Sequence, residues 1–456
     1  MRELGRPVLA AAAVVVCGAS MTILDSTIVN VAIERLAIAF DTPLATIQWV
    51  TTAYLIALAS VIPLAGWASD RFGARRAFMA SVAAFVAGSV LCGLAWSAGS
   101  LIAFRVLQGL GGGLVMPVGM TILARAAGPD RMGRVMALVG VPMLLMPALG
   151  PALGGALIDA VSWRLIFLVN APVGLAALVL AHRTLPREAA RPARLDALGL
   201  ALLSPGLALL VAGLTGTVAA LAPGALLVVA FAVHAQRASD PLIDLRIFRD
   251  RTVGAAAATT LLFGAAFFGS QLILALYYQV AKDLSALQTG LLLGVQGAGA
   301  MVTMPLAGKL TDRGGAGPIV LGGIALVLLG TVPFAAHDAP GWLLAAGLFL
   351  RGAGMGATLM PAMAAGYAAL APEQVARAAS ALEVAQRVGA MFGVALLAVI
   401  LQRQLGASLS ELEGADAATV AEPAAHTFVW ALALTAATLV PALGLQGRRS
   451  AEPATA

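Results

Sequence analysis

The chain has 456 residues, of which 60% are apolar and only 11% are charged, and its mean hydropathy is +0.94. A soluble domain needs a charged surface, so this balance excludes a soluble protein and predicts an all-α polytopic membrane protein. The net charge of +6 needs no nucleic-acid partner, because most of the basic residues gather in loops on one side of the predicted spans.

Fourteen apolar runs are long enough to cross a ~30 Å hydrocarbon core as helices. They lie near 8–33, 45–68, 77–97, 101–124, 135–157, 164–182, 196–215, 217–235, 252–280, 288–307, 318–335, 342–369, 376–402 and 427–446. With these spans, one side of the membrane holds 21 of the 28 Lys and Arg residues and the other side holds four. The positive-inside rule therefore places both termini in the cytoplasm.

One short polar loop occurs twice in this apolar chain. The stretch "GWASDRFGARR" begins at Gly66, and "GKLTDRGGAG" begins at Gly308, 242 residues later. A second pair of similar stretches, "FRVLQGLGGGLVMP" and "LRGAGMGATLMP", ends at Pro117 and Pro361, which are 244 residues apart. The near-constant offset equals eight apolar runs and indicates an internal repeat.

An offset of eight runs fits two six-helix repeats with two further helices inserted between them. We therefore predict a first repeat over 1–183, a linker with two inserted helices over 184–236, and a second repeat with a cytoplasmic tail over 237–456. Parallel repeats with a binding site at their interface near mid-membrane are the architecture of alternating-access transporters. No HExxH motif and no metal-ligand spacing of Cys or His occurs, so we expect neither a metal nor an enzyme.

Six phrases in order along the chain resemble the major facilitator superfamily, and in particular its fourteen-span drug:proton antiporters. They are "LDSTIVNVAI" from Leu24, "GWASDRFGARR" from Gly66, "RVLQGLGGG" from Arg105, "LGPALGG" from Leu149, "WRLIFLVNAPVG" from Trp163 and "PLIDLRIF" from Pro241. The resemblance implies the major facilitator fold and export of lipophilic or cationic drugs in exchange for protons. The proton gradient would supply the energy without a cofactor. We expect a monomer in a cell membrane. Arg outnumbers Lys 26 to 2 and Ala is abundant, a composition that indicates a GC-rich bacterial genome.

Asp25 is the main candidate for proton coupling. It lies in the middle of the first span, where a charge costs about 2.5–3.5 kcal/mol on insertion scales. Desolvation favours its protonated form, whereas a cation or a nearby Arg favours release of the proton. Arg105 in the fourth span is expected to act on Asp25 in this way, as the resemblance also implies. Glu383 is a second candidate; with Arg387 four residues later, it is either functional or part of a neutralising pair.

The repeated loop is expected to act as a gate. Asp70 and its repeat counterpart Asp312 can bridge to neighbouring Arg residues, and a carboxylate is also favoured near a helix N-terminus. Such a cluster can hold one state of the transporter and break in the other. The predicted gating residues are Asp70, Arg71, Arg75, Arg76, Asp312 and Arg313.

The fifth span carries a glycine- and proline-rich motif that, by resemblance, marks exporters. Gly150 and Gly154 lie four residues apart and permit close helix contact, with Gly155 following. Pro147 and Pro151 each remove a helical hydrogen bond and favour bending. Ordinary packing would use the same physics, so the direction of transport rests on the resemblance.

Substrate contacts and substrate identity are the least determined by the sequence. Tyr54 and Gln271 lie on spans expected to line a cavity, and Arg387 puts dicationic substrates in doubt. Two alternatives stay open. The protein could export one endogenous metabolite, such as an antibiotic, a siderophore or a lipid, or it could be a sensor or scaffold that no longer transports.

Overall fold

The computed structural model describes residues 5–128, 131–160, 162–187, 193–214, 217–282, 284, 286–336, 339–370, 374–405 and 417–445. Within these ranges all regular elements are helices, which confirms the all-α class, and each predicted apolar run overlaps a helix or a short series of helices. Ten of the described helices are long and apolar enough to cross a membrane, or eleven if the bent pair Trp49–Val61 and Leu64–Phe72 forms one span. The fourteen-span count and the side of the termini remain predictions.

The chain packs as two compact units. Unit 1 comprises Met1–Gly128, Pro142–Arg246 and Leu370–Val384, and unit 2 comprises Pro129–Val141, Ile247–Ala369 and Ala385–Ala456. Two long helices, α9 (Met132–Ala160) and α18 (Val375–Leu405), contribute to both units. This division describes packing, so the repeat boundaries remain a prediction.

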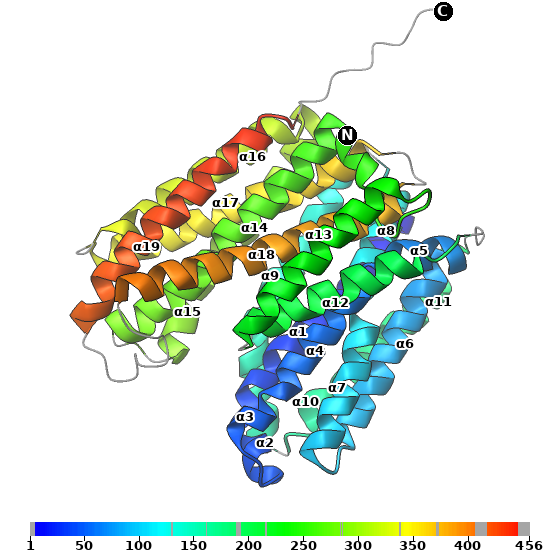
Figure 1. Cartoon of the computed structure of the whole chain (residues 1–456), viewed down its shortest axis with the longest axis horizontal. Coiled ribbons are helices and arrows are strands. Elements are labelled where there is room, and N and C mark those ends of the chain that lie inside the picture. Colours follow the sequence, from blue (N-terminus) through cyan, green and yellow to red (C-terminus); the bar gives the residue numbers. More distant parts are fainter. Residues whose placement is uncertain are drawn as a thin grey trace, which may run out of the picture. The chain divides into compact units, whose positions relative to one another are not determined.

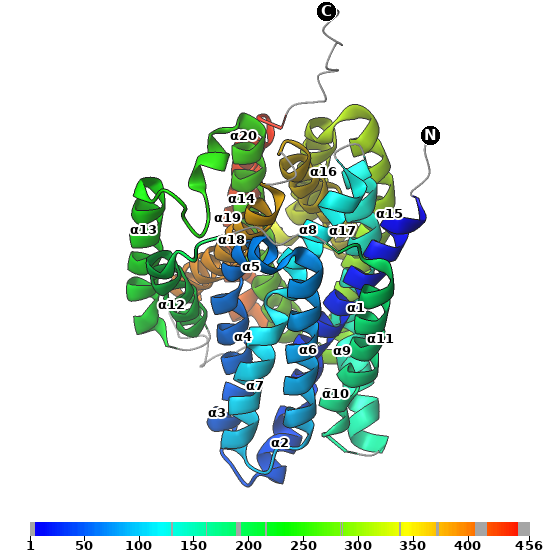
Figure 2. The same ribbon diagram turned by 90° about the vertical axis from the view of Figure 1, so that its right-hand side faces the viewer.

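Unit 1 holds the elements of the first predicted repeat and the two inserted helices (Figures 1 and 2). Its elements, besides parts of α9 and α18, are α1 (Arg6–Ile28), η1 (Val29–Ala32), α2 (Ile33–Ala39), α3 (Leu44–Ile47), α4 (Trp49–Val61), α5 (Leu64–Phe72), α6 (Ala74–Gly93), α7 (Ala98–Gly112), α8 (Val115–Ala127), α10 (Leu165–Leu168), α11 (Asn170–Thr184), α12 (Ala197–Leu214), η3 (Val218–Ala220) and α13 (Leu221–Arg237). Figure 2 shows α4, α7, α6 and α11 running side by side. The inserted helix α12 packs on α13 and on α4, so the insertion belongs to this unit.

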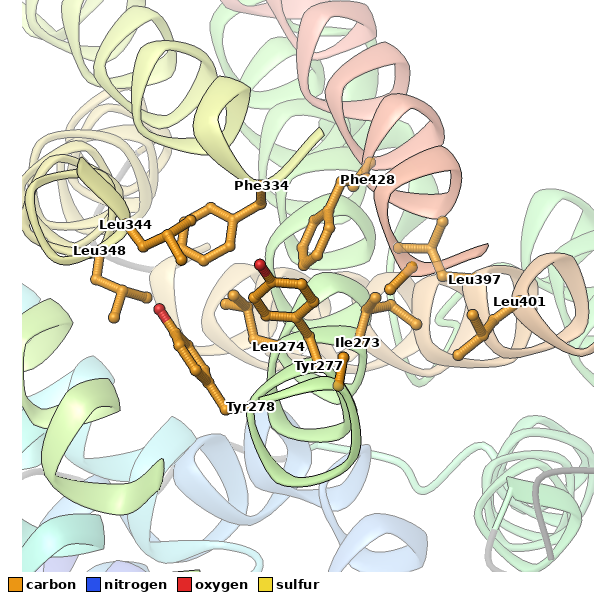
Figure 3. Packing of buried hydrophobic residues seen from close by; sticks show 13 residues of the cluster. Ile273, Leu274, Tyr277, Tyr278, Phe334, Leu344, Leu348, Leu397, Leu401 and Phe428 are labelled. Carbon is orange, nitrogen blue, oxygen red and sulfur yellow. The ribbon is translucent and has the colours of Figure 1, made fainter. Parts of the chain in front are cut away.

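Unit 2 holds most elements of the second predicted repeat. They are α14 (Arg251–Leu276), the π-helical turn η5 (Tyr277–Ala281), α15 (Ala286–Gly314), α16 (Ala316–Thr331), η6 (Val332–Ala335), α17 (Gly341–Ala368), α19 (Ala417–Ala437) and α20 (Leu439–Ala442), while η4 (Leu245–Arg249) spans the boundary. Figure 3 shows the aromatic core of this unit, where Tyr277 and Tyr278 from η5 lie near Phe334 and Phe428. The Tyr277 ring packs edge-on against the rings of Phe334 and Phe428, with 6.2 and 6.3 Å between centroids. The wider π turn places two successive Tyr rings in one core.

Residues in the loops determine where α6, α7 and α16 begin. Ser97 and Ser100 form a capping box that starts α7, with bonds of 3.1 and 3.0 Å between each hydroxyl and the other residue's N–H. The two copies of the repeated loop share a backbone device: Gly73 and Gly315 adopt φ of 83° and 86° immediately before α6 and α16. Their separation, 315 − 73 = 242, equals the sequence offset of the loops. Glycine adopts such angles without strain, which explains its presence in both copies.

Candidate functional site

The centre of unit 1 contains a completely buried ion pair. Arg105 on α7 donates from Nη1 to Asp25 Oδ2 on α1 at 2.5 Å, and both side chains have 0% exposure. The expected proximity of these two residues is therefore confirmed. A buried ion pair needs further hydrogen bonds to offset the loss of hydration, so the surrounding polar groups are part of the site.

Two amide side chains complete the hydrogen bonding of Asp25, and Ser89 supports them. Its Oδ1 accepts from Gln108 Nε2 and from Asn170 Nδ2, both at 2.8 Å. Gln108 also donates to Ser89 Oγ at 2.6 Å and accepts from Arg105 at 2.7 Å. Residues of α1, α7 and α11 thus meet at one carboxylate, and Ser89 of α6 accepts hydrogen bonds from two of its partners, Gln108 and Asn170. Asp25 thus accepts three hydrogen bonds, from Arg105, Gln108 and Asn170.

Two residues of α4 also contact Arg105. Its Nε donates to the carbonyl of Val50 at 3.0 Å, and its guanidinium lies 3.9 Å from the centroid of the Tyr54 ring. Tyr54 is fully buried, and its hydroxyl bonds the carbonyl of Thr22 at 3.4 Å. In this structure Tyr54 therefore supports the guanidinium through a cation–π contact. Arg105 Nη2 is buried and has no hydrogen-bond partner among the described residues.

Two members of this network, Asn170 and Ser89, were missed by the sequence analysis. Asn170 stands in the phrase "WRLIFLVNAPVG", and it is 1% exposed at the start of α11. Burying a polar amide in an apolar membrane helix costs free energy unless the amide is hydrogen-bonded. An Asn in this apolar stretch was therefore the sequence signal for a buried polar contact. Ser89 carries a weaker signal, since a Ser hydroxyl can bond its own helix.

Three other predicted site residues lie on α18 and α14. Glu383 is 8% exposed on α18, and it is not among the hydrogen-bond partners of Asp25. Arg387 is half-buried one turn later on α18. Gln271 on α14 has a buried Oε1 without a hydrogen-bond partner in the described part of the chain. In that same part, no group of three His, Cys, Asp or Glu side chains could hold a metal ion.

Asp70 in the first loop copy pairs with two Arg residues within unit 1. Its carboxylate lies 3.7 Å from Arg125 Nη2 on α8 and 3.5 Å from Arg377 Nε near the start of α18. Arg377 also donates to Asp240 at 2.7 Å. The loop aspartate of the first predicted repeat therefore contacts a residue of the second.

Asp312 in the second loop copy makes the equivalent contact within unit 2. It lies 2.6 Å from Arg134 Nε and accepts from the backbone N–H of Gly133 at 2.8 Å, at the first turn of α9. The expected favourable position of a carboxylate at a helix N-terminus is thus found here. Arg134 and Arg377 are each the third residue of their helix, and 377 − 134 = 243 matches the repeat offset. The two contacts follow the internal repeat.

The expected partners of Asp70 need correction. Arg71, Arg75 and Arg76 follow Asp70 in the sequence but do not form its ion pairs. The positive φ of Gly73 turns the chain between α5 and α6, and Arg75 donates to the carbonyl of His182 at the end of α11, at 2.6 Å. In the second copy, Arg313 is exposed in the last turn of α15.

The glycine motif packs α9 against α1 beside the buried ion pair. A β-carbon at Gly150 would overlap Thr27 Oγ1, and one at Gly154 would lie 2.8 Å from Ile28 Cγ1. The predicted close helix contact is confirmed at these two positions. Gly155 faces open space, so the same reason does not apply to it. The side chains of Pro147 and Pro151 lie outside the described residues.

Unit 2 contains a buried Arg at the repeat position of Arg105. Arg351 on α17 is 1% exposed and donates to Thr331 Oγ1 at 2.5 Å and to Ser270 Oγ at 2.6 Å. No carboxylate of the described residues pairs with it. The two repeats thus differ: one buried Arg faces a carboxylate and the other faces hydroxyls.

The sequence matches the model of the Major Facilitator Superfamily over residues 15–394 and 256–444. The chain is 46% identical over 419 residues to a multidrug resistance protein B homolog of Mycobacterium tuberculosis, covering 88% of this chain and 77% of that protein. It is 33% identical over 423 residues to a tetracenomycin C resistance and export protein of Streptomyces glaucescens, with 88% and 77% covered.

Solved structures show the same fold at low identity. The human organic anion transporter MFSD10 matches with a TM-score of 0.66 and 17% identity, covering 94% of this chain and 100% of that chain. The proton:xylose symporter XylE matches with a TM-score of 0.65 and 14% identity, covering 96% and 97%.

Proposed function

Because the chain belongs to the major facilitator superfamily, we propose that it exports lipophilic or cationic drugs, including antibiotics, from the cytoplasm in exchange for protons. The observation that carries the coupling is the buried contact between Asp25 and Arg105. Export is supported by relatives that are named for multidrug resistance and for drug export. The protein would act as a monomer in the cell membrane, driven by the proton gradient without a cofactor.

Asp25 is the group that takes up and releases the proton. In the described structure its carboxylate accepts three hydrogen bonds, one of them from a guanidinium that stays charged at accessible pH. Protonation of Asp25 removes one acceptor from this network and frees Arg105 to move. A cationic substrate competes with the proton for the same negative charge, so occupancy by one disfavours the other. Glu383 is the second candidate for this role.

The two loop contacts act as the gate of the transport cycle. Asp70 with Arg377 and Asp312 with Arg134 each join residues of different predicted repeats. A relative movement of the repeats must break or form these contacts, which makes them sensitive to the state of the transporter. Gly150 and Gly154 let α9 lie against α1 next to Asp25, so a change at Asp25 can act on α9 directly.

The test uses purified full-length protein in liposomes that contain a pH-sensitive dye. A panel of lipophilic cations and antibiotics is added across an imposed pH gradient. We expect substrate-dependent proton flux that is lost in Asp25→Asn and retained in Asp41→Asn, a matched change in an exposed loop. Flux that survives Asp25→Asn would move the proton site, with Glu383→Gln tested next.

A narrower exporter is the second candidate, because one relative is named for resistance to and export of a single compound, tetracenomycin C. Flux with one compound of the panel but not with unrelated ones would favour this reading. Absence of flux with every compound, in protein that remains folded, would favour a sensor or scaffold that no longer transports.

A further inference from the structure

A basic pocket opens where α5 turns into α6. It has a volume of about 220 Å³ and is lined by Arg75 and Arg76 of α6, by His182 at the end of α11 and by Arg187. No acidic residue of the described chain lines it. Arg76 and Arg187 are exposed, and neither forms an ion pair among the described residues. The pocket therefore suits an anionic group with several acceptor oxygens, such as a phosphate.

An apolar groove begins beside this pocket. It has a volume of about 530 Å³ and follows α6 from Ala77 through Ala84 to Leu91. These fifteen residues of helix span about 22 Å, more than half of a ~30 Å hydrocarbon core. Phe72, which is 47% exposed, lines both the groove and the basic pocket. The two cavities thus adjoin along α6, which Figure 2 shows between α7 and α11.

A polar atom within the groove adds an independent observation. Trp67 of α5 lines the groove and packs edge-on against Phe72, with 5.5 Å between ring centroids. Its indole N–H is buried and has no hydrogen-bond partner among the described residues. A buried hydrogen-bond donor without a partner destabilises the fold. An acceptor oxygen on a bound molecule would supply the missing hydrogen bond.

We propose that these two cavities form one binding site for an anionic phospholipid, with the phosphate in the Arg75–Arg76–Arg187 pocket and an acyl chain along the α6 groove. The glycerol ester oxygens lie between these parts, within reach of Trp67. Charge complementarity favours this occupant, because the described lining holds three Arg side chains and no carboxylate, which selects an anionic headgroup. The adjoining apolar groove distinguishes a lipid from free phosphate, which has no group to fill it.

The test measures lipid binding to the purified, delipidated full-length chain by native mass spectrometry. The probes are dioleoyl phosphatidylglycerol, dioleoyl phosphatidylcholine and inorganic phosphate. Each basic residue near a membrane surface contributes a factor of about five in affinity for anionic lipid, so Arg76→Gln with Arg187→Gln should weaken phosphatidylglycerol binding roughly thirtyfold. Phosphatidylcholine binding should fall much less in this variant, because the choline cation of this lipid offsets the charge of its phosphate. Arg237→Gln, an exposed Arg on α13, is the control for loss of charge.

A second variant tests the groove without changing charge. Ala84→Phe should weaken binding of both lipids, because Ala84 lines the groove, whereas its exposed neighbour Ala83 does not line it and Ala83→Phe should have no effect. Equal binding of the two lipids by the wild-type protein would overturn the headgroup assignment. Displacement of phosphatidylglycerol by equimolar inorganic phosphate would overturn the lipid assignment in favour of free phosphate. A groove variant that leaves lipid binding intact but blocks binding of a lipophilic cation would assign the groove to substrate instead.

Discussion

Arg105 and Arg351 occupy equivalent positions of the two predicted repeats, yet Arg105 donates to the carboxylate of Asp25 and Arg351 donates to two hydroxyls. Both guanidinium groups are buried. Removal of Arg105 leaves a buried carboxylate behind, whereas removal of Arg351 leaves two hydroxyls. This difference makes the two positions unequal in energy and in function.

Replacement of the two Arg residues by Met should therefore have unequal effects. Arg105→Met leaves a buried carboxylate without its cation, at a cost of about 3–5 kcal/mol. Arg351→Met should cost less than half as much, because Thr331 and Ser270 keep their bonds to the carbonyls of Val327 and Phe267. Thermal unfolding of both variants in one detergent measures the difference. Adding Asp25→Asn to Arg105→Met should recover part of the loss, and equal losses in the two single variants would contradict this account.

The two loop aspartates should differ in strength. Asp312 is 6% exposed and accepts two bonds shorter than 3 Å, whereas Asp70 is 12% exposed with its ion-pair partners at 3.5 and 3.7 Å. Asp312→Ala should destabilise the protein by about 2 kcal/mol or more, and Asp70→Ala by about 1 kcal/mol or less. Unfolding and transport are measured for both. The exchange Asp312→Arg with Arg134→Asp should restore part of the lost transport; no restoration would argue against an ion pair at this position.

Two glycines of one motif provide a matched pair. Gly150→Ala introduces a methyl group that overlaps Thr27 Oγ1, and Gly155→Ala places the same group in open space. Overpacking of this kind costs about 1–3 kcal/mol, so Gly150→Ala should lower the unfolding temperature and Gly155→Ala should not. Transport rates of the two variants should follow the same order. A Gly155→Ala variant that loses as much stability as Gly150→Ala would show that close packing is not the reason for the motif.

The Asp196 carboxylate links the two inserted helices, because it precedes α12 and bonds His234 on α13. Its contribution to the stability of the fold depends on pH. Burial raises the pKa of the Asp196 carboxyl, but hydrogen bonds from the N–H of Gly199, from His234 and from the N–H of Leu242 outweigh burial and lower it below its ordinary value. The Asp196 carboxylate therefore stabilises the fold above the unfolded-chain pKa of about 3.9, and this contribution is lost as the pH falls through the lower folded value.

Asp196→Asn tests this pH dependence. The substitution should lower the unfolding temperature at pH 7, because Asn forms weaker hydrogen bonds with the same donors. The difference from wild type should shrink as the pH falls below about 4, where the wild-type carboxylate also loses its charge. Unfolding in detergent at a series of pH values, with Asp41→Asn as the control, provides the measurement. A difference that stays constant down to pH 3 would contradict the role of the charge.

The sequence alone determined the elements and the central pair of the candidate site. Apolar runs of about 20 residues form helices in a membrane irrespective of their neighbours, because every backbone group must be bonded within the segment. The cost of a buried charge marked Asp25 and Arg105 as residues that need a partner. The spacing of Gly150 and Gly154 likewise predicted a close helix contact, since residues four apart lie on one helix face.

Only the tertiary structure decided which distant groups meet. Asn170 lies 145 residues from Asp25 and bonds its carboxylate, and Arg377 lies 377 − 70 = 307 residues from Asp70 and pairs with it. The sequence instead suggested Arg71, Arg75 and Arg76 for Asp70, because they are its neighbours along the chain. Local sequence fixes helix periodicity and the cost of burying each side chain, but the partner of a buried polar group depends on how separate helices pack, and that packing is set by the whole chain.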